Sequence, residues 1–171
     1  MGEIISWDDG RRIRENLWAH SQVMVFTNGL FDILHVGHLR MLRRARALGD
    51  VLVVGVNSDA SALAFKGPGH PLVPQAERAE LLAALAPVDF VIVFDEVSAE
   101  RLVDLLCPDV YVKGGDYSLP QQGGTGGELK IPPEAQIVLR RGGEVKILPY
   151  EEGHSSSDLI GKVLTIYGVC E

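Results

Sequence analysis

The sequence has few cysteines, few aromatic residues, no excess of basic residues and no long hydrophobic run. Its two cysteines, Cys107 and Cys170, form no CxxC pair, which argues against a disulfide framework or a structural zinc site. No uninterrupted apolar stretch approaches the ~18 residues of a membrane-spanning helix. The N-terminus also lacks the basic-then-apolar order of a signal peptide. We therefore expect a cytoplasmic protein that does not enter a membrane.

The charge balance is acidic, with a formal net charge of -7. Sequence-independent binding to nucleic acids requires Lys and Arg that neutralise phosphates, and docking on anionic membranes requires the same residues. The chain is therefore a poor candidate for either partner, although a local basic pocket for a small phosphate compound is compatible with this charge. The length of 171 residues and the hydrophobic fraction of 46% fit one domain with a substantial core.

Short apolar runs rich in β-forming residues alternate with segments of helical periodicity. The predicted strands are 23–27, 51–56, 88–94, 109–114, 136–140 and 145–150, and the predicted helices are 1–22, 37–48, 75–85, 98–106, 155–166 and a short stretch after Ser58. Segments 66–74 and 115–133 are predicted loops, rich in Gly and Pro. The alternation predicts an α/β fold with a single Rossmann-like, doubly wound parallel sheet and helices on both faces. We divide the chain into an N-terminal helical segment, 1–22, and one domain, 23–171.

Four polar or glycine-rich segments follow predicted strands. They are 27–38, 56–59, 113–117 and 153–157. In doubly wound sheets, ligands bind beyond the carboxyl ends of the strands, where the strand order reverses. These segments are therefore expected to meet at one edge of the sheet and to form the binding site.

The segment 27–38 reads TNGLFDILHVGH and is the densest of the four. His35 and His38 fall within one turn at a predicted helix N-terminus, where backbone N–H groups favour anions. Two imidazoles there can stabilise the charge that builds up when a phosphate group is attacked, and Gly37 leaves room for that phosphate. Two other interpretations are open: the histidines only cap the helix, or they bind a metal with a distant third ligand.

The same segment resembles the HxGH signature of the cytidylyltransferase-like nucleotidyltransferase superfamily, in its longer form TNGxFDxLHxGH. The resemblance implies that His35 and His38 are catalytic residues that contact the triphosphate and stabilise the transition state. It also implies nucleotide-binding roles for Thr27, Asn28, Gly29, Phe31, Asp32 and Gly37.

Further candidates lie in the other polar segments. The stretch GHSSSDLI, 153–160, is similar to a serine-rich motif of the same superfamily, so Ser155 and Ser156 are candidate phosphate ligands, although one serine serves equally well as a helix cap. Lys66 lies beside glycine in a predicted loop and is a candidate third catalytic residue that clamps the triphosphate; otherwise it is a solvated charge. The remaining candidates are Lys113 for the nucleotide and Asp59, Arg78 and Asp116 for the second substrate, with Asp59 equally suited to capping a helix.

Residues 23–165 resemble the adenylyltransferase half of bacterial ADP-heptose synthase, through VNSD, the KGPGHP loop, LAAL followed by VD, and PDVYVKGGDY. The resemblance implies transfer of AMP from ATP to a heptose 1-phosphate, giving pyrophosphate and ADP-heptose for lipopolysaccharide or related glycans. We expect Mg²⁺ to accompany the ATP phosphates, with no protein metal site. The sugar-kinase half has no counterpart, so we expect a separate kinase to supply the sugar phosphate.

Three features depart from the family pattern: Leu30, His70 and the glycine-rich loop 118–133. We interpret the loop as a lid.

Two other functions are open. The first is a cytidylyltransferase acting on glycerol 3-phosphate or a similar alcohol phosphate, which is disfavoured because YEEGHSS stands where that branch has RTEGIST. The second is a non-catalytic nucleotide-binding module, against which both histidines, Lys66 and the serines argue. Dimers are common in the superfamily, so the resemblance also implies a homodimer, with the N-terminal helix as a candidate interface.

Overall fold

A six-stranded sheet carries the fold, and its neighbouring strands all pair in parallel, in the order β1-β4-β3-β2-β5-β6. A computed structural model of the chain describes residues 1–114, 131–149 and 155–168. The strands are β1 Glu3–Ile4, β2 Met24–Gly29, β3 Val51–Asn57, β4 Phe90–Phe94, β5 Val110–Gly114 and β6 Glu144–Leu148. The predicted parallel α/β sheet is confirmed.

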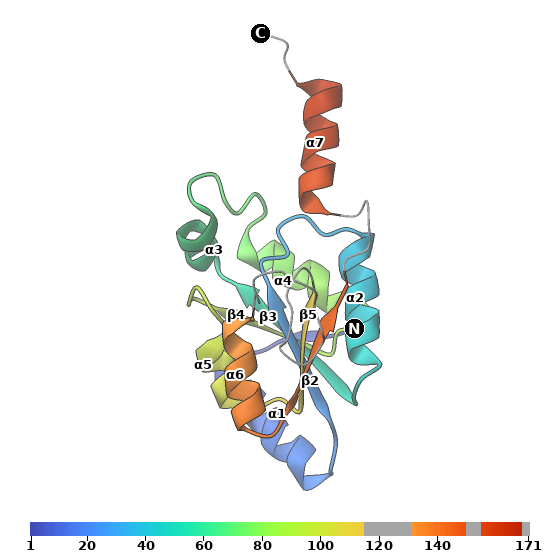
Figure 1. Cartoon of the computed structure of the whole chain (residues 1–171), viewed down its shortest axis with the longest axis vertical. Coiled ribbons are helices and arrows are strands. Elements are labelled where there is room, and N and C mark those ends of the chain that lie inside the picture. The colour runs from blue at the N-terminus through green and yellow to red at the C-terminus, as the bar shows by residue number, and fades with distance from the viewer. Residues whose placement is uncertain (115–130, 150–154, 169–171) are drawn as a thin grey trace, which may run out of the picture.

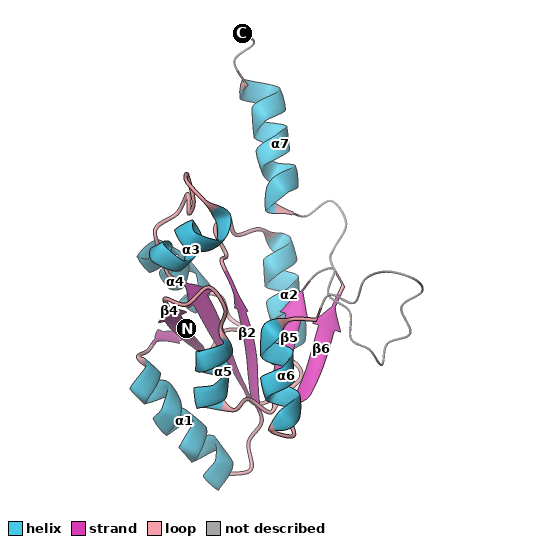
Figure 2. Cartoon of the chain, turned by 60° about the vertical axis from the view of Figure 1, so that its left-hand side comes forward, coloured by secondary structure: helices cyan, strands magenta, loops and turns pink. Residues whose placement is uncertain are grey.

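Helices cover both faces of this sheet (Figure 1 and Figure 2). They are α1 Trp7–Ala19, α2 Val36–Arg46, α3 Asp59–Lys66, α4 Gln75–Ala83, α5 Glu100–Leu106, α6 Pro133–Arg140 and α7 Ser156–Tyr167. Successive residues of a strand point to opposite faces. Phe26 of β2 therefore packs in a core with Leu102 of α5, whereas its neighbour Val25 packs in a second core with Leu42 of α2. Helices α1, α5 and α6 cover the first face, and α2 and α4 cover the second.

Serine side chains begin three of the helices. Ser6, Ser58 and Ser155 each accept a hydrogen bond from the backbone N–H three residues later, at 3.1, 3.2 and 3.0 Å. Such a cap satisfies an N–H group that has no partner within the helix and contributes about 1 kcal/mol. The predicted helix start after Ser58 is confirmed.

The strand predicted at 136–140 is wrong, because this segment belongs to helix α6. Pro133 begins the helix, where its missing N–H costs nothing. Ala135 and Val138 are buried at helical spacing, and Gly142 follows the helix with a positive φ of 84°. Two adjacent parallel strands need a crossover, usually a helix, and α6 provides it between β5 and β6. The prediction relied on the β-branched residues Ile137 and Val138, which favour a strand, and could not take the order of the strands in the sheet into account.

Two other local predictions need correction. The helix predicted for 1–22 exists over Trp7–Ala19, but Glu3–Ile4 pairs with β4 as an edge strand that is too short to show a period. The prediction that Ser98 caps the next helix is wrong. Ala99 takes the N-cap position of α5, and the Ser98 hydroxyl donates to the Glu100 carboxylate at 2.6 Å.

Helix α7 projects beyond the end of the sheet (Figure 1). None of its residues is buried, although one side of it carries apolar residues. Its first residue is tied to the body of the molecule, because the Ser156 hydroxyl donates to the carbonyl oxygen of Ile33 at 3.3 Å. The homodimer stays a prediction.

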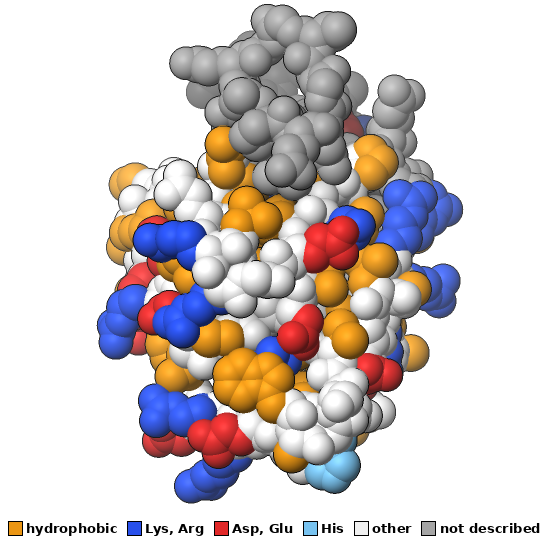
Figure 3. All heavy atoms as spheres, turned by 60° about the horizontal axis from the view of Figure 1, so that its bottom comes forward, with side chains coloured by type: hydrophobic (Ala, Val, Ile, Leu, Met, Phe, Trp, Pro, Cys, Tyr) orange, Lys and Arg blue, Asp and Glu red, His pale blue; other side chains and the backbone are white. Residues whose placement is uncertain are grey.

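The surface mixes charges of both signs. Figure 3 shows this at the end of the molecule remote from α7, where Lys and Arg side chains lie beside Asp and Glu. Exposed ion pairs such as Arg12–Asp9, at 3.2 Å, are part of this pattern. Within the described ranges, no helix is both long enough and apolar enough to cross a bilayer.

Candidate active site

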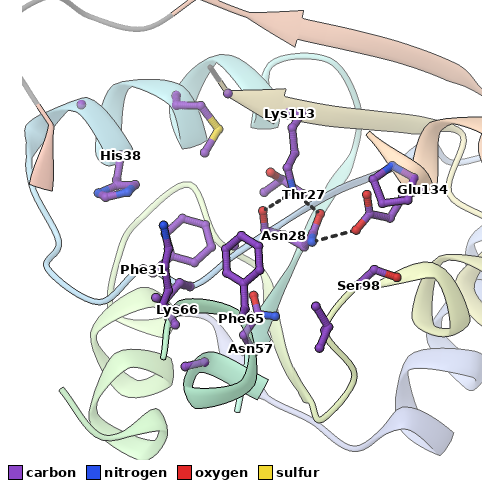
Figure 4. A pocket seen from close by; sticks show the side chains of 18 of the residues that line it. Thr27, Asn28, Phe31, His38, Asn57, Phe65, Lys66, Ser98, Lys113 and Glu134 are labelled. Carbon is purple, nitrogen blue, oxygen red and sulfur yellow. Dashed lines mark hydrogen bonds between the residues drawn. The ribbon is translucent and has the colours of Figure 1, made fainter. Parts of the chain in front are cut away.

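A cavity of about 540 Å³ opens at the carboxyl ends of β2, β3 and β5 (Figure 4). β2 lies between β3 and β5, so the strand order reverses here and the cavity occupies the switch point of the sheet. Sequence-predicted site residues that line it are Thr27, Asn28, Gly29, Phe31, His35, Gly37, His38, Lys66 and Lys113. Three separate segments of the chain, 27–38 and those that carry Lys66 and Lys113, thus contribute predicted residues to one site.

The two histidines of the signature lie at the N-terminus of α2. His35 is the N-cap residue, and its ring centroid lies 3.9 Å from that of His38. The His35 side chain makes no capping hydrogen bond with the first turn, which argues against the interpretation of this residue as a simple cap. The buried Phe31 ring packs 5.3 Å from the His38 ring and fixes its position. Both imidazoles therefore line the cavity where helix N–H groups favour an anion.

His38 is neutral at pH 7. Burial, and after it the charge that His35 can carry, lowers the pKa of His38 to about 4. Its Nδ1 atom is buried without a hydrogen-bond partner among the described residues. A neutral imidazole has one N–H group and one acceptor nitrogen. His38 can therefore donate one hydrogen bond to a phosphate oxygen.

The same pKa shift predicts how stability depends on pH. Because the pKa of His38 is about 4 in the folded chain and about 6.5 when unfolded, the unfolded chain binds more protons between these values. The free energy of unfolding should then fall as pH drops from about 6.5 to 4, by roughly 2–3 kcal/mol from this residue. Urea unfolding of wild type and His38→Ala across this range measures the difference. Equal pH dependence in both proteins would contradict the shift.

A buried polar network forms the back of the cavity. The Asn28 side-chain oxygen accepts from the Tyr111 hydroxyl at 2.8 Å and from Lys113 Nζ at 3.1 Å, and its nitrogen donates to Glu134 at 3.2 Å. Figure 4 shows the contacts of Asn28 with Lys113 and Glu134 as dashed lines. Burial lowers the pKa of Lys113, and the nearby charge of Glu134 works in the opposite direction. The network thus holds an amine and a carboxyl group on opposite sides of one amide.

Asp32 does not line the cavity but anchors the loop that follows Lys66. Its carboxylate accepts hydrogen bonds from the backbone N–H groups of Leu72 and Val73 at 2.8 and 2.9 Å. Burial tends to raise the pKa of Asp32, but these bonds and the neighbouring His70 and Arg78 side chains outweigh it and hold the pKa below its usual value. Asp32 therefore joins the segment after β2 to the loop after α3.

Arg78 and Asp59 also lie outside the cavity lining. Arg78 is 0% exposed and donates to the carbonyl oxygens of Val73, Leu30 and Asn57 at 2.7–2.8 Å. It also donates to the Asp59 carboxylate at 2.7 Å. The guanidinium therefore joins three segments of the chain, two of which line the cavity through Leu30 and Asn57. The predicted substrate roles of Arg78 and Asp59 stay predictions.

The serine candidates lie at the start of α7. Ser155 caps this helix in a reciprocal arrangement with Asp158, and Ser156 bonds to Ile33 in the loop before α2. Neither lines the cavity, so their predicted phosphate contacts stay predictions. Asp116 and residues 118–130 of the proposed lid lie outside the described residues.

Sequence reasoning did not find several residues that line the cavity. They are Leu30, Met41, Arg44, Asn57, Ala62, Phe65, Val97, Ser98, Gly114, Pro133, Glu134 and Pro149. Most belong to no recognisable motif. Glu134 was missed for a second reason: it lies between the predicted loop 115–133 and the predicted strand 136–140, whereas the structure places it in the first turn of α6. A buried acid in that position has no local sequence signal.

The part of the chain that the structure describes contains no group of three or more His, Cys, Asp or Glu side chains arranged to hold a metal ion. His35 and His38 lie close to each other, but no such third side chain completes a site there.

Comparison with known proteins identifies the family of this chain and proteins with similar sequences. The sequence profile of the cytidylyltransferase-like family matches residues 26–162. The chain is 46% identical over 149 residues to the bifunctional protein HldE of Citrifermentans bemidjiense, a match that covers 87% of this chain and 28% of that protein. The chain thus spans less than a third of the length of this curated relative.

Solved structures show similar folds. A lipopolysaccharide core biosynthesis protein from Thermoplasma volcanium has a TM-score of 0.57 and 28% identity, covering 76% of this chain and 97% of that one. Pantoate-beta-alanine ligase from Francisella tularensis, solved with an ATP analogue and beta-alanine, has a TM-score of 0.59 at 14% identity, covering 99% of this chain and 79% of that one. The second match bears on the fold alone.

Proposed function

Because the chain belongs to the cytidylyltransferase-like family of nucleotidyltransferases, we propose that it transfers AMP from ATP to a heptose 1-phosphate. The products are ADP-heptose and pyrophosphate. The observation that carries this proposal is the pair of imidazoles, His35 and His38, at a helix N-terminus inside the switch-point cavity. That arrangement suits an α-phosphate that gains charge during attack.

The reaction needs no covalent intermediate on the protein. An oxygen of the sugar phosphate attacks the α-phosphorus of ATP, and the bond from that phosphorus to the oxygen bridging to the β-phosphate breaks. Pyrophosphate leaves with the electron pair of that bond. The neutral His38 donates a hydrogen bond to the oxygens on the α-phosphorus, and His35 lies in place to do the same. Lys66 and Lys113 also line the cavity and donate hydrogen bonds to the other phosphates.

Mg²⁺ enters this proposal as part of the nucleotide substrate. Mg²⁺ prefers oxygen ligands and is often bound through substrate phosphates with few protein ligands. The described residues fit this mode, since those that line the cavity include histidines and lysines and their only acid is Glu134, one oxygen of which already accepts two hydrogen bonds. A reaction that consumes ATP also leads us to expect a cytoplasmic location.

The choice of a heptose 1-phosphate rests on the relatives. The HldE protein shares 46% identity with this chain, and the T. volcanium protein has a lipopolysaccharide-related name. The resemblance to the adenylyltransferase half of ADP-heptose synthase extends this to ATP as the nucleotide. The sequence YEEGHSS, in place of RTEGIST, supports ATP over CTP.

Pyrophosphate release with Mg²⁺ tests the proposal. ATP, CTP, GTP and UTP are each paired with heptose 1-phosphate, in both anomers, and with glycerol 3-phosphate; His38→Ala serves as the inactive control. We expect release with ATP and one heptose anomer. Release with CTP and glycerol 3-phosphate would replace the proposal by an alcohol-phosphate cytidylyltransferase. Nucleotide binding without release from any pair would favour a non-catalytic module.

Lys66→Ala should lower kcat/KM for ATP by roughly 10–100-fold. The side chain lines the cavity at the end of α3, with its nitrogen 5.1 Å from the Phe65 ring centroid. A hydrogen bond to a charged group contributes about 1.5–3 kcal/mol, which gives this range. Steady-state kinetics measure the effect, with Lys162→Ala on α7 as the matched control that should behave as wild type. Kinetics of Lys66→Ala equal to this control would make Lys66 a surface charge.

A further inference from the structure

Glu134 is a buried acid that the proposed reaction does not use. It lies in the first turn of α6, is 2% exposed and lines the cavity. A buried carboxylate is costly unless its oxygens are hydrogen-bonded. Here one oxygen accepts from the Ala99 backbone N–H at 3.0 Å and from Asn28 Nδ2 at 3.2 Å, and the other lies 3.1 Å from the Tyr111 hydroxyl. The acid is therefore built into the wall of the cavity.

These contacts fix the orientation of the Asn28 side chain. An amide has a donor end and an acceptor end of nearly equal shape, so its orientation depends on its partners. Lys113 Nζ donates to the Asn28 side-chain oxygen at 3.1 Å and to the Asn28 backbone carbonyl oxygen at 3.3 Å. Glu134 faces the Asn28 nitrogen. A flipped amide would set its NH₂ group against the N–H groups of Lys113 and its oxygen against the oxygen of Glu134.

The amide then has one group left for a ligand. Its oxygen has two lone pairs, which accept from Tyr111 and Lys113, and one of its two N–H groups donates to Glu134. The second N–H group has no acceptor among the described residues. Because Asn28 lines the cavity, the orientation set by Glu134 offers a donor, and no acceptor, to whatever binds there.

We propose that Glu134 is a positioning residue for nucleotide binding, which holds the Asn28 amide so that its N–H meets an acceptor atom of the nucleotide. This inference rests on the proposed function, because it takes the ligand of the cavity to be a nucleotide. A phosphate oxygen is the acceptor that fits best, since the neighbouring Lys113 favours the same charge. The effect depends on the shape and hydrogen bonding of Glu134 and not on its charge.

Two conservative variants separate geometry from charge. In Glu134→Gln, the side-chain oxygen can still accept from Ala99 and Asn28. The new NH₂ group can donate to the Tyr111 oxygen, while the Tyr111 hydroxyl keeps its hydrogen bond to the Asn28 oxygen. In Glu134→Asp, the charge stays but the side chain is one methylene shorter, so its oxygens withdraw from Asn28. If geometry matters and charge does not, Glu134→Gln should preserve nucleotide affinity and Glu134→Asp should reduce it.

The experiment measures the Kd of a non-reactive ATP analogue with a methylene bridge between the α- and β-phosphates, by calorimetry, together with the thermal stability of each variant. We expect Glu134→Gln to bind within about threefold of wild type. Glu134→Asp and Glu134→Ala should bind roughly tenfold more weakly, the scale of one lost hydrogen bond. Tyr111→Phe, which keeps the contact between Glu134 and Asn28, should stay within about threefold. Measuring well below each Tm separates a binding defect from simple destabilisation.

Each other outcome has a distinct meaning. Unchanged binding in Glu134→Asp would overturn the positioning role, and so would equal weakening in the Gln and Asp variants. These results would leave the proposed function intact. If wild type binds neither the ATP analogue nor any other nucleoside triphosphate, the proposed function itself fails, and the inference fails with it. Should Glu134→Ala not fold, the Gln and Asp variants still decide the question.

Discussion

His38→Ala should lower kcat for pyrophosphate release by about 10²–10³-fold, the scale for losing one hydrogen-bond donor to a developing oxyanion. His38 lines the cavity beside His35 and is held there by the Phe31 ring. Its donor function operates in the transition state, so KM for ATP should change much less than kcat. Steady-state kinetics with ATP and heptose 1-phosphate measure both parameters.

The control for His38 is His20→Ala. His20 is exposed at the end of α1, outside the cavity lining, and bonds to the Asn16 carbonyl at 2.8 Å. This variant should retain wild-type turnover. If His38→Ala also turns over at the wild-type rate while remaining folded, His38 is not the oxyanion donor and the mechanism must depend on other groups.

Arg78→Ala should destabilise the fold by about 3–5 kcal/mol, the cost of breaking a buried charged network. The guanidinium is fully buried, and its removal leaves the carbonyl oxygens of Leu30 and Asn57 without this donor. For a chain of this size, the melting temperature should fall by roughly 6–20 °C. Calorimetry of the unliganded protein measures the change without depending on any activity.

Arg12→Ala is the matched control for Arg78. The Arg12 side chain is 77% exposed and forms a surface ion pair with Asp9, which should contribute less than about 1 kcal/mol. A melting temperature of Arg78→Ala as high as that of Arg12→Ala would mean that the buried network does not support the cavity wall. That result would favour the other role predicted for Arg78 from the sequence, which is direct binding of the second substrate.

Local sequence information was sufficient for the signature segment. The strand end, the turn and the helix start of 27–38 follow one another along the chain, so the meeting of His35 and His38 could be predicted. The parallel sheet was predictable because β3 is a continuous apolar run, typical of a strand buried on both faces.

Residues that depend on distant contacts could not be predicted in this way. Glu134 meets Asn28 across 106 positions of sequence, and no local pattern marks either the contact or the burial of the acid. The sequence made Arg78 a candidate for binding the second substrate and gave no sign of its burial, because arginine is rarely fully buried; the fold encloses it completely. The segment 136–140 was misjudged because the need for a crossover between β5 and β6 appears only once the sheet order is known.

The central position of β2 in the sheet has a consequence for synthesis on the ribosome. β2 can pair with β3 early, but its other edge waits for β5, which begins only at Val110. Until then the nascent chain carries an unpaired, apolar strand edge, which can recruit strands of other chains. Such long-range pairing is also slow. The cavity needs both neighbours of β2, so a nucleotide can stabilise the chain only after this late step is complete.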